Sequence, residues 1–196
     1  MEIIIHKINS IKKLRAIPKY YGVEIDIRSF KSKLILNHEP RKSGDQLLDY
    51  LSEYKNGTII FNIKEAGIEK EVFKYAKRFN VKSYFLLDVE HPFILTFGVK
   101  LKKNLAVRFS EYEPIELSKK FKKFTEWMWI DTINKLPINR DNLSTVKTFK
   151  TCLVSPERWG RKKDIKKYIN YFKRNNYIPN AIMTDMKCSN IWEKFL

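Results

Sequence analysis

The sequence lacks the features that mark several large classes of protein. No run of about 18 apolar residues occurs, so we expect no transmembrane helix. Residues 1–6 read Met-Glu-Ile-Ile-Ile-His, without a basic segment or a small-residue cleavage site, so we expect no secretory signal. The chain has two cysteines, Cys152 and Cys188, which are far apart and belong to no metal-binding spacing. These absences predict reduced thiols in a cytoplasmic protein.

Nothing in the sequence divides the chain into parts. It contains no internal repeat and no low-complexity linker. Its 196 residues suffice for one domain with a substantial core and are too few for two comfortable ones. Apolar residues make up 43% and aromatic residues 14%, which supports a packed core and argues against disorder. We therefore expect residues 1–196 to form a single domain.

Acidic residues are scarce relative to basic ones. Lysine and arginine number 39 against 22 acids, which gives a net charge of +17. Such a charge attracts polyanions and anionic membrane surfaces. The basic residues are spread along the chain, however, and form no arginine-rich arm. Two interpretations stay open: a solvated basic surface and a nucleic-acid-binding face. A phosphate-bearing substrate, or peripheral association with an anionic membrane, would also suit this charge.

Short β-rich runs alternate with amphipathic helical stretches along the chain. The strand-like runs cover residues 3–5, 23–27, 34–36, 58–63, 83–87, 105–109, 127–130, 151–154 and 181–183. The helical stretches cover residues 45–54, 69–79, 92–96, 117–124, 164–174 and the segment from 189 onward. Residues 12–21 are expected to form a short helix or turn, interrupted by Pro18. Strands that alternate with helices predict βαβ units and a parallel sheet.

Eight such strands closing on themselves would form a (β/α)₈ barrel of the TIM type. The run 34–36 would be a short extra hairpin strand, because only a tight turn separates it from the preceding run and a parallel partner needs a longer crossover. The alternative is an open doubly wound sheet, although the sequence has no glycine-rich strand-to-helix turn that would bind a nucleotide there. Trp127 and Trp129 share one face of their strand and are interpreted as core residues.

Polar residues gather where the predicted strands end. In a (β/α)₈ barrel these carboxyl-terminal ends meet at one mouth, where catalytic residues lie. The alternative is that the strands simply become polar as they reach water. The residues concerned are His6, Glu24, Asp26, His38, Asn62, Lys64, Asp88, Arg108, Glu111, Asp131, Glu157, Thr184 and Asp185.

Glu24 and Asp26 form the sharpest local pattern. Residues two apart on a strand point to the same face, so both carboxylates would project together. Two adjacent carboxylates repel each other unless a positive charge lies between them. A hard divalent cation such as Mg²⁺ or Ca²⁺ would suit the pair, and the alternative is a structural ion pair with lysine or arginine.

Two of the three histidines follow strands near these carboxylates. His6 ends the first strand and His38 follows the third. A pair of histidines across a phosphate can supply a base and an acid at neutral pH. His91 precedes a proline in a loop-like stretch and is interpreted as incidental.

Three short segments resemble a known enzyme family in their order and spacing. Ile-Ile-His-Lys at residues 4–7, Val-Glu-Ile-Asp-Ile-Arg at 23–28 and Leu-Ile-Leu-Asn-His-Glu-Pro at 34–40 resemble motifs of the glycerophosphodiester phosphodiesterases and their phosphatidylinositol phospholipase C relatives. That family carries His-Arg, then Glu-x-Asp, then His-Asp-Pro. Asn62-Ile63-Lys64 stands where the family has Glu-x-Lys, and Thr184-Asp185 resembles its final Thr-Asp.

The resemblance implies a barrel enzyme of lipid metabolism that hydrolyses phosphodiesters with a divalent metal, Mg²⁺ or Ca²⁺. By this likeness His6 and His38 would be the acid/base pair. Glu24 and Asp26 would bind the metal, with Asn62 as the third ligand, and Lys64 would neutralise charge on the phosphoryl oxygens.

This sequence departs from the family pattern at three places. Lys7 replaces an arginine, and lysine binds phosphate as a point charge whereas arginine binds it with two parallel hydrogen bonds. Asn62 replaces a carboxylate, so its oxygen would ligate a cation without contributing charge. The segment after His6 is short and lacks the family's Pro-Glu-Asn-Thr stretch, which leaves the alcohol groups of the substrate open.

Loops after later strands would line the same mouth. Lys7, Arg108 and Glu111 are candidate substrate-binding residues, and Glu111 is also a candidate for the missing acid. The segment 155–161, Ser-Pro-Glu-Arg-Trp-Gly-Arg, is either part of the mouth or ordinary loop. The sequence thus predicts a metal-dependent phosphodiester hydrolase acting on a small or polymer-linked substrate. A barrel that binds a phosphate ligand without turnover, and a basic nucleic-acid-binding protein, are the alternatives.

Overall fold

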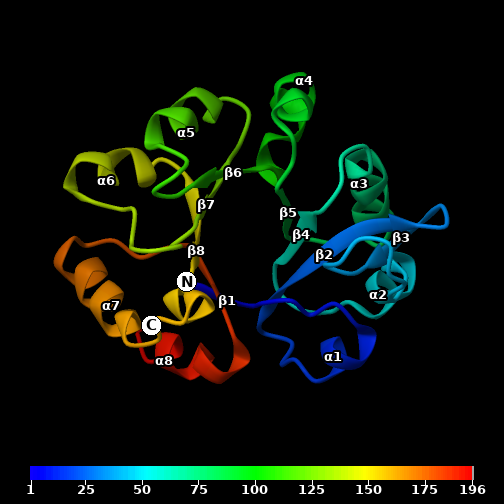
Figure 1. Cartoon of the computed structure of the whole chain (residues 1–196), viewed down its shortest axis with the longest axis horizontal. Coiled ribbons are helices and arrows are strands. Elements are labelled where there is room, and N and C mark those ends of the chain that lie inside the picture. Colours follow the sequence, from blue (N-terminus) through cyan, green and yellow to red (C-terminus); the bar gives the residue numbers. More distant parts are fainter. Residues whose placement is uncertain (196) are drawn as a thin grey trace.

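The computed structural model describes residues 1–195 and shows strands wrapped into a barrel with helices around the outside (Figure 1). The strands are β1 (Glu2–Ile5), β2 (Gly22–Phe30), β3 (Lys33–Leu36), β4 (Ile59–Ile63), β5 (Tyr84–Leu87), β6 (Ala106–Phe109), β7 (Trp127–Ile130), β8 (Lys150–Val154) and β9 (Ala181–Thr184). The α-helices are α1 (Ile11–Arg15), α2 (Leu47–Glu53), α3 (Glu69–Arg78), α4 (His91–Leu101), α5 (Ile115–Phe121), α6 (Arg140–Val146), α7 (Asp164–Arg174) and α8 (Ser189–Glu193).

The strands form one sheet in the order β5-β4-β2-β1-β9-β8-β7-β6, and all eight of these run parallel. The barrel nearly closes between β5 and β6, where a single bridge joins Leu86 to Leu105. The predicted (β/α)₈ barrel is therefore confirmed. β3 pairs antiparallel with β2 outside this path, which confirms the extra hairpin strand.

The β2–β3 hairpin explains why β2 is the longest strand. Lys31 (φ 47°) and Ser32 (φ 59°) form the connection, and both lie in the left-handed region. A two-residue turn with this backbone matches the twist of the strands that it joins. The hairpin extends beyond the barrel wall (Figure 1). After it the Asn37 N–H donates to the Asp26 carbonyl at 3.1 Å, which brings the segment with His38 to the edge of the mouth.

Side chains alternate along each strand between two apolar layers. Outward residues such as Val23 and Ile25 pack under the helices, in the larger cluster. Inward residues fill the barrel interior, where Phe85 stacks on Trp127 with ring centroids 4.5 Å apart. The interior cluster is Ile4, Ile60, Phe85, Leu87, Ala106, Trp127, Trp129, Cys152, Val154, Ala181 and Met183. Both tryptophans are thus core residues, as predicted from their strand.

The helices differ from the sequence-based ranges at a few places. Helix α1 is shorter than residues 12–21, and α4 continues past residue 96 to Leu101. Helix α6 was not predicted, because it buries few apolar side chains and is fixed instead by a capping box between Asn139 and Asn142. The closing helix predicted from residue 189 is present as α8, and residue 196 lies outside the described residues.

Two further expectations bear on the core and on membranes. Cys152 and Cys188 are both free and buried. Within residues 1–195, no helix is long and apolar enough to cross a membrane.

Candidate active site

His6 follows β1 at the carboxyl-terminal end of the barrel. Its backbone N–H donates to the carbonyl of Thr184 at 3.0 Å, which continues the pairing of β1 with β9. The imidazole Nε2 lies 3.9 Å from Glu24 Oε2, and Nδ1 lies 3.9 Å from Asp185 Oδ1. The ring is therefore held between a carboxylate of β2 and one that follows β9.

Lys7 contributes to the site through its backbone. Its φ of 57° is in the left-handed region, and its N–H donates to Glu24 Oε2 at 2.8 Å. The side chain is exposed. Lys7 therefore helps to hold a buried carboxylate through its main chain.

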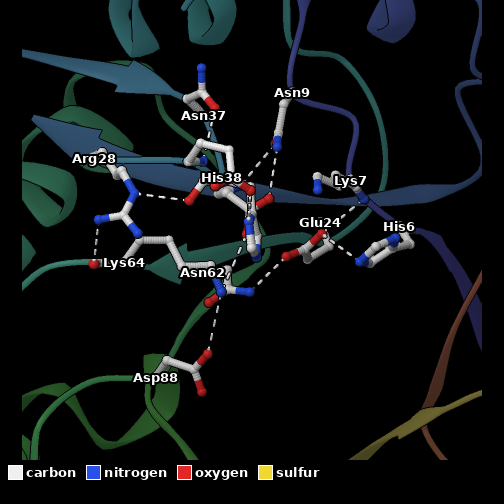
Figure 2. Close-up of polar contacts among 12 residues, drawn as sticks. His6, Lys7, Asn9, Glu24, Arg28, Asn37, His38, Asn62, Lys64 and Asp88 are labelled. Carbon is white, nitrogen blue, oxygen red and sulfur yellow. Dashed lines mark hydrogen bonds and ion pairs between the residues drawn. The ribbon is translucent and has the colours of Figure 1, made fainter. Parts of the chain in front are cut away.

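Glu24 and Asp26 project into the mouth from β2 and are almost fully buried, at 1% and 2% exposure. Glu24 Oε1 accepts a hydrogen bond of 2.8 Å from Asn62 Nδ2, and Asp26 Oδ2 accepts one of 2.7 Å from Asn9 Nδ2 (Figure 2). Lys64 Nζ lies 3.3 Å from Asp26 Oδ1. Burial, and then the charge of Asp26, raise the pKa of Glu24 to about 7.

The surroundings of Asn62 indicate whether this group of residues fits a metal ion. Asn62 Nδ2 donates a hydrogen bond to Glu24, and Asn62 Oδ1 is buried without any hydrogen-bond partner. An unpaired buried carbonyl oxygen is costly unless something occupies its lone pairs. Two carboxylates and an amide oxygen are the donor types that hard divalent cations prefer. The donor set fits such an ion, although no group of three or more His, Cys, Asp or Glu side chains converges within residues 1–195.

Lys64 begins a chain of alternating charges that runs across the mouth. Its ammonium lies between Asp26 and Asp88, at 3.3 and 3.6 Å. Asp88 in turn pairs with the guanidinium of Arg108, which also pairs with Asp131. The end of β2 is thus connected through β4, β5 and β6 to β7 by ion pairs.

His38 lies at the edge of the site and is partly open to solvent. Its side chain is 48% exposed, and Nδ1 lies 2.9 Å from Glu39 Oε1. Arg28 fixes the segment by donating from Nε to the His38 carbonyl at 3.0 Å and from Nη1 to the Lys64 carbonyl at 2.9 Å (Figure 2). Arg28 therefore ties the hairpin segment to the end of β4.

Arg158 reaches His6 from the loop after β8. Its Nη2 lies 3.2 Å from His6 Nε2, and its Nη1 donates to Asp185 Oδ1 at 2.9 Å. Burial, then the charge of Arg158, then those of Lys7, Lys64 and His38, lower the pKa of His6 to about 3. The imidazole is therefore neutral at physiological pH.

The structure brings most of the sequence-predicted residues together, but it separates some of them. His6, Glu24, Asp26, Asn62 and Lys64 form a contiguous group, and Arg108 joins it through Asp88. Glu111 does not contact this group. Its Oε1 accepts from the Asn134 backbone, so it links the loops after β6 and β7.

Sequence reasoning missed several residues that the site uses. Asn9 belongs to no motif, and Arg28 closes the segment 23–28 but was given no role. Only the three-dimensional structure reveals their bonds to Asp26, His38 and Lys64. Arg158 and Trp159 fall in the segment 155–161, for which the mouth was one of two interpretations. Trp159 Nε1 donates to Asp131 at 3.0 Å, so this loop does line the mouth.

The fold and the cluster define a TIM-type (β/α)₈ barrel with a buried acidic pair and a histidine at its mouth. The same fold is found in the crystal structure of a glycerophosphoryl diester phosphodiesterase from Parabacteroides distasonis, with a TM-score of 0.61. The likeness covers 93% of this chain and 81% of that chain, at 9% sequence identity, and it shows the shared fold. No protein-family model matches the sequence, and no similar sequence was found among curated proteins.

Proposed function

We propose that the protein is a phosphoric diester hydrolase of the glycerophosphodiester phosphodiesterase type. The observation that carries the proposal is His6, a neutral imidazole held 3.9 Å from the buried Glu24 at the mouth of the barrel. A site that concentrates a base, two carboxylates and several cations suits an anionic substrate whose negative charge grows during reaction. A solved enzyme with this fold has phosphodiesterase activity in its name, which supports the assignment.

We further propose that Glu24, Asp26 and Asn62 hold a divalent ion, Mg²⁺ or Ca²⁺. When bound, the ion would stabilise negative charge on the phosphoryl oxygens. The unpaired Oδ1 of Asn62 and the raised pKa of Glu24 both support a missing positive partner. Because only two of these three ligands are charged, we expect this site to bind the ion more weakly than a site with three carboxylates would.

The chain's own residues would handle the proton transfers. A hydroxyl oxygen bonds to phosphorus while its proton passes to His6, and the bond from phosphorus to the leaving oxygen breaks while His38 supplies a proton. The negative phosphate offsets the cations around His6, which makes its imidazole a better base than in the empty site. Lys64, between Asp26 and Asp88, would stabilise the phosphoryl oxygens.

Arg108 and Lys7, the two cations expected from the sequence to bind substrate, would have different roles. Arg108 is surrounded by Asp88, Asp131 and Glu113, so it organises the wall of the mouth and has little freedom to move toward a phosphate. The exposed side chain of Lys7 is free to approach the substrate. We propose a small or polymer-linked phosphodiester as the substrate, and a cytoplasmic location.

Hydrolysis of model phosphodiesters tests the proposal. Bis(p-nitrophenyl) phosphate and glycerophosphodiesters are incubated with the protein and Mg²⁺, Ca²⁺, Mn²⁺ or EDTA. We expect metal-dependent product release that His6→Ala abolishes. His91→Ala is the matched control and should retain activity, because this ring lies against Phe121, with centroids 4.6 Å apart, and takes no part in the hydrogen bonds and ion pairs of the cluster. The phosphorus NMR spectrum of the product distinguishes attack by water from attack by a substrate hydroxyl, which yields a cyclic phosphate.

Folded protein without turnover on any substrate or metal would contradict hydrolysis. Binding of inorganic phosphate at the mouth by such a protein would favour the alternative of a ligand-binding barrel. Tight, steeply salt-dependent binding of generic RNA or DNA, unchanged by His6→Ala, would favour the nucleic-acid alternative.

A further inference from the structure

Helix α4 differs in composition from the other long helices of the barrel. Helices α3 and α7 carry charged residues along their outer faces, as surface helices usually do. Helix α4 reads His-Pro-Phe-Ile-Leu-Thr-Phe-Gly-Val-Lys-Leu, and Lys100 is its single lysine, arginine or acid. A helix of this composition is expected to be covered on most of its surface.

The structure leaves one apolar face of α4 uncovered within residues 1–195. Leu95 is 54% exposed and Val99 is 72% exposed, and the two lie one turn apart on the same face. Half-buried Phe93 and Phe97 form the adjacent row, with ring centroids 4.8 Å apart. On its inner side Ile94 is buried. Figure 1 shows α4 at the periphery of the barrel, where these exposed side chains meet solvent.

Lysines flank this apolar face on three sides, and the exposed Glu90 precedes the helix on the fourth. Lys70 Nζ lies 4.5 Å above the Phe97 ring, on the α3 side. On the α5 side, Gly98 packs directly against Phe124, whose ring is covered by Lys123 at 4.7 Å. Lys100 is on the helix itself, and Lys103 follows it and is exposed. An apolar strip with a cationic margin is the pattern of a helix that lies in the interface of an anionic bilayer.

We propose that α4 docks the protein on anionic membrane surfaces. Leu95 and Val99 insert among the acyl chains, while the surrounding lysines remain at the lipid head groups. The net charge favours an anionic membrane over a second copy of the chain as the partner of this surface, because two molecules of net charge +17 repel each other. Two exposed apolar side chains are also too small an area for a stable dimer, which needs about 800 Å² per partner.

Docking through α4 would place the membrane next to the mouth of the barrel. A cavity of about 400 Å³ is lined by His91 and Ile94 of α4. Asp88 and Arg108, which form ion pairs across the mouth, line the same cavity. The first turn of the helix therefore borders the candidate active site. Membrane binding itself does not depend on catalysis, so the two proposals can fail separately.

Vesicle sedimentation tests the proposal. The full chain is mixed with vesicles of phosphatidylcholine, or of phosphatidylcholine with one third phosphatidylglycerol. We expect binding to the anionic vesicles and little to the neutral ones. The double variant Leu95→Gln/Val99→Gln keeps the charge and should weaken binding roughly tenfold, because it removes the inserted apolar area. Lys100→Gln/Lys103→Gln should weaken it about fivefold per lysine.

A matched control uses apolar residues that are equally exposed elsewhere. Tyr20 is 70% exposed and Ile178 is 60% exposed. They precede β2 and β9, at the amino-terminal end of the strands and therefore opposite the mouth of the barrel. Tyr20→Gln/Ile178→Gln should bind vesicles as the original chain does. Equal binding by the α4 variant and this control would overturn the proposal, and so would the absence of binding to anionic vesicles.

Two other outcomes would also overturn it. A concentration-dependent dimer that the α4 variant disrupts would assign the surface to a second copy. RNA that displaces the protein from vesicles, and binds the α4 variant equally well, would assign the basic surface to nucleic acid. Thermal unfolding of each variant checks that the fold is intact, which we expect because all substituted side chains are exposed.

Discussion

At the scale of single residues, the site concentrates groups that disfavour each other when no ligand is present. Glu24 and Asp26 are both buried on one face of β2. Of these two carboxylates only Asp26 forms an ion pair with Lys64, which also pairs with Asp88. Asn62 leaves its Oδ1 unpaired beside them. Buried like charges and unsatisfied polar atoms lower stability, and they are common where function requires them.

Glu24→Gln should therefore make the protein more stable in EDTA. Rotation of the Asn62 amide would let its Oδ1 accept from the new amide group, while the remaining oxygen still accepts from the Lys7 N–H. Removing the buried charge should add about 1–3 kcal/mol to the free energy of unfolding at pH 8. Thermal unfolding measures this, and activity should be lost. A less stable variant would show that Glu24 is favourably solvated in the empty site.

The stability that Glu24→Gln gains over the original protein should increase as pH rises. Because the pKa of Glu24 is raised from 4.5 to about 7, the original protein loses stability relative to the variant as pH rises through this window. Below pH 4.5 the two should be similar, because the carboxyl is then protonated in both the folded and the unfolded chain. Above pH 7 the difference should be constant.

Arg158 should contribute to turnover by binding the phosphate next to His6. Its guanidinium is oriented by Asp185 and is 27% exposed, so it can exchange its contact with His6 for one with substrate. Arg158→Ala should lower kcat/KM roughly 100-fold, and Arg158→Lys should recover part of that loss, since lysine keeps the charge without the paired hydrogen bonds. Arg174→Ala at the end of α7 is the control. Equal activity of Arg158→Ala and the original protein would exclude this role.

The residues that the sequence identified are those whose position follows from strand spacing. Glu24 and Asp26 are two apart on a strand, and His6 ends one, so a barrel model places them at the mouth without further information. Asn9 could not be found in this way, because it lies outside a strand and its partner Asp26 is 17 residues away. Arg28 shares the spacing of Glu24 and Asp26, but its bond to the Lys64 carbonyl, 36 residues away, follows from no spacing rule. Arg158 was included only as part of a polar loop segment.

At the scale of elements, the β2–β3 hairpin shows how local chemistry shapes the mouth. Its turn places Lys31 and Ser32 in left-handed backbone, which β-carbon atoms disfavour. The hairpin nevertheless forms, because Leu34 and Leu36 are buried in the outer core. Tertiary packing therefore outweighs an unfavourable turn sequence.

Replacing the turn by Lys31→Asn/Ser32→Gly should stabilise the protein by about 1 kcal/mol, since Asn-Gly is the preferred pair for this turn. Denaturant unfolding measures the change. Ser52→Gly within α2 is the control, and it should destabilise by roughly 0.5–1 kcal/mol, because glycine weakens a helix interior. A loss of stability in the turn variant would mean that the left-handed residues make contacts of their own.

The elements that were predicted well have strong periodicity. Helix α7 and strand β7 agree residue for residue with the predicted ranges 164–174 and 127–130. Helix α6 was missed because its stability comes from capping by Asn139 and not from an apolar stripe. Helix α4 was predicted too short because its apolar face does not follow the usual inside–outside pattern.

At the scale of the whole molecule, the net charge of +17 opposes folding, because the compact state brings lysines close together. Salt shortens the distance over which such charges repel each other, from tens of ångströms at low salt to a few ångströms at high salt. Raising sodium chloride from low to moderate concentration should therefore raise the melting temperature by a few degrees, a change of about 1 kcal/mol. A melting temperature that falls with salt would show that the ion pairs across the mouth outweigh the surface repulsion.

The overall architecture was predictable because barrel closure is a property of the element order. Nine β runs, one of them a hairpin, leave eight strands for a parallel barrel. The weak closure between β5 and β6 was not predictable. It depends on a single bridge between Leu86 of β5 and Leu105, which directly precedes β6. The same seam borders the cavity that connects α4 to the mouth.

Binding of a divalent ion by Glu24, Asp26 and Asn62 is the property on which the proposed chemistry depends, and calorimetric titration measures it directly. Mg²⁺, Ca²⁺ and Mn²⁺ are titrated into the original protein and into Glu24→Gln, each first freed of metal with EDTA. We expect one ion to bind per chain of the original protein, with stabilisation against heat, and no binding to the variant. A folded original protein that binds none of the three ions, or a variant that binds them equally well, would contradict the metal-assisted site.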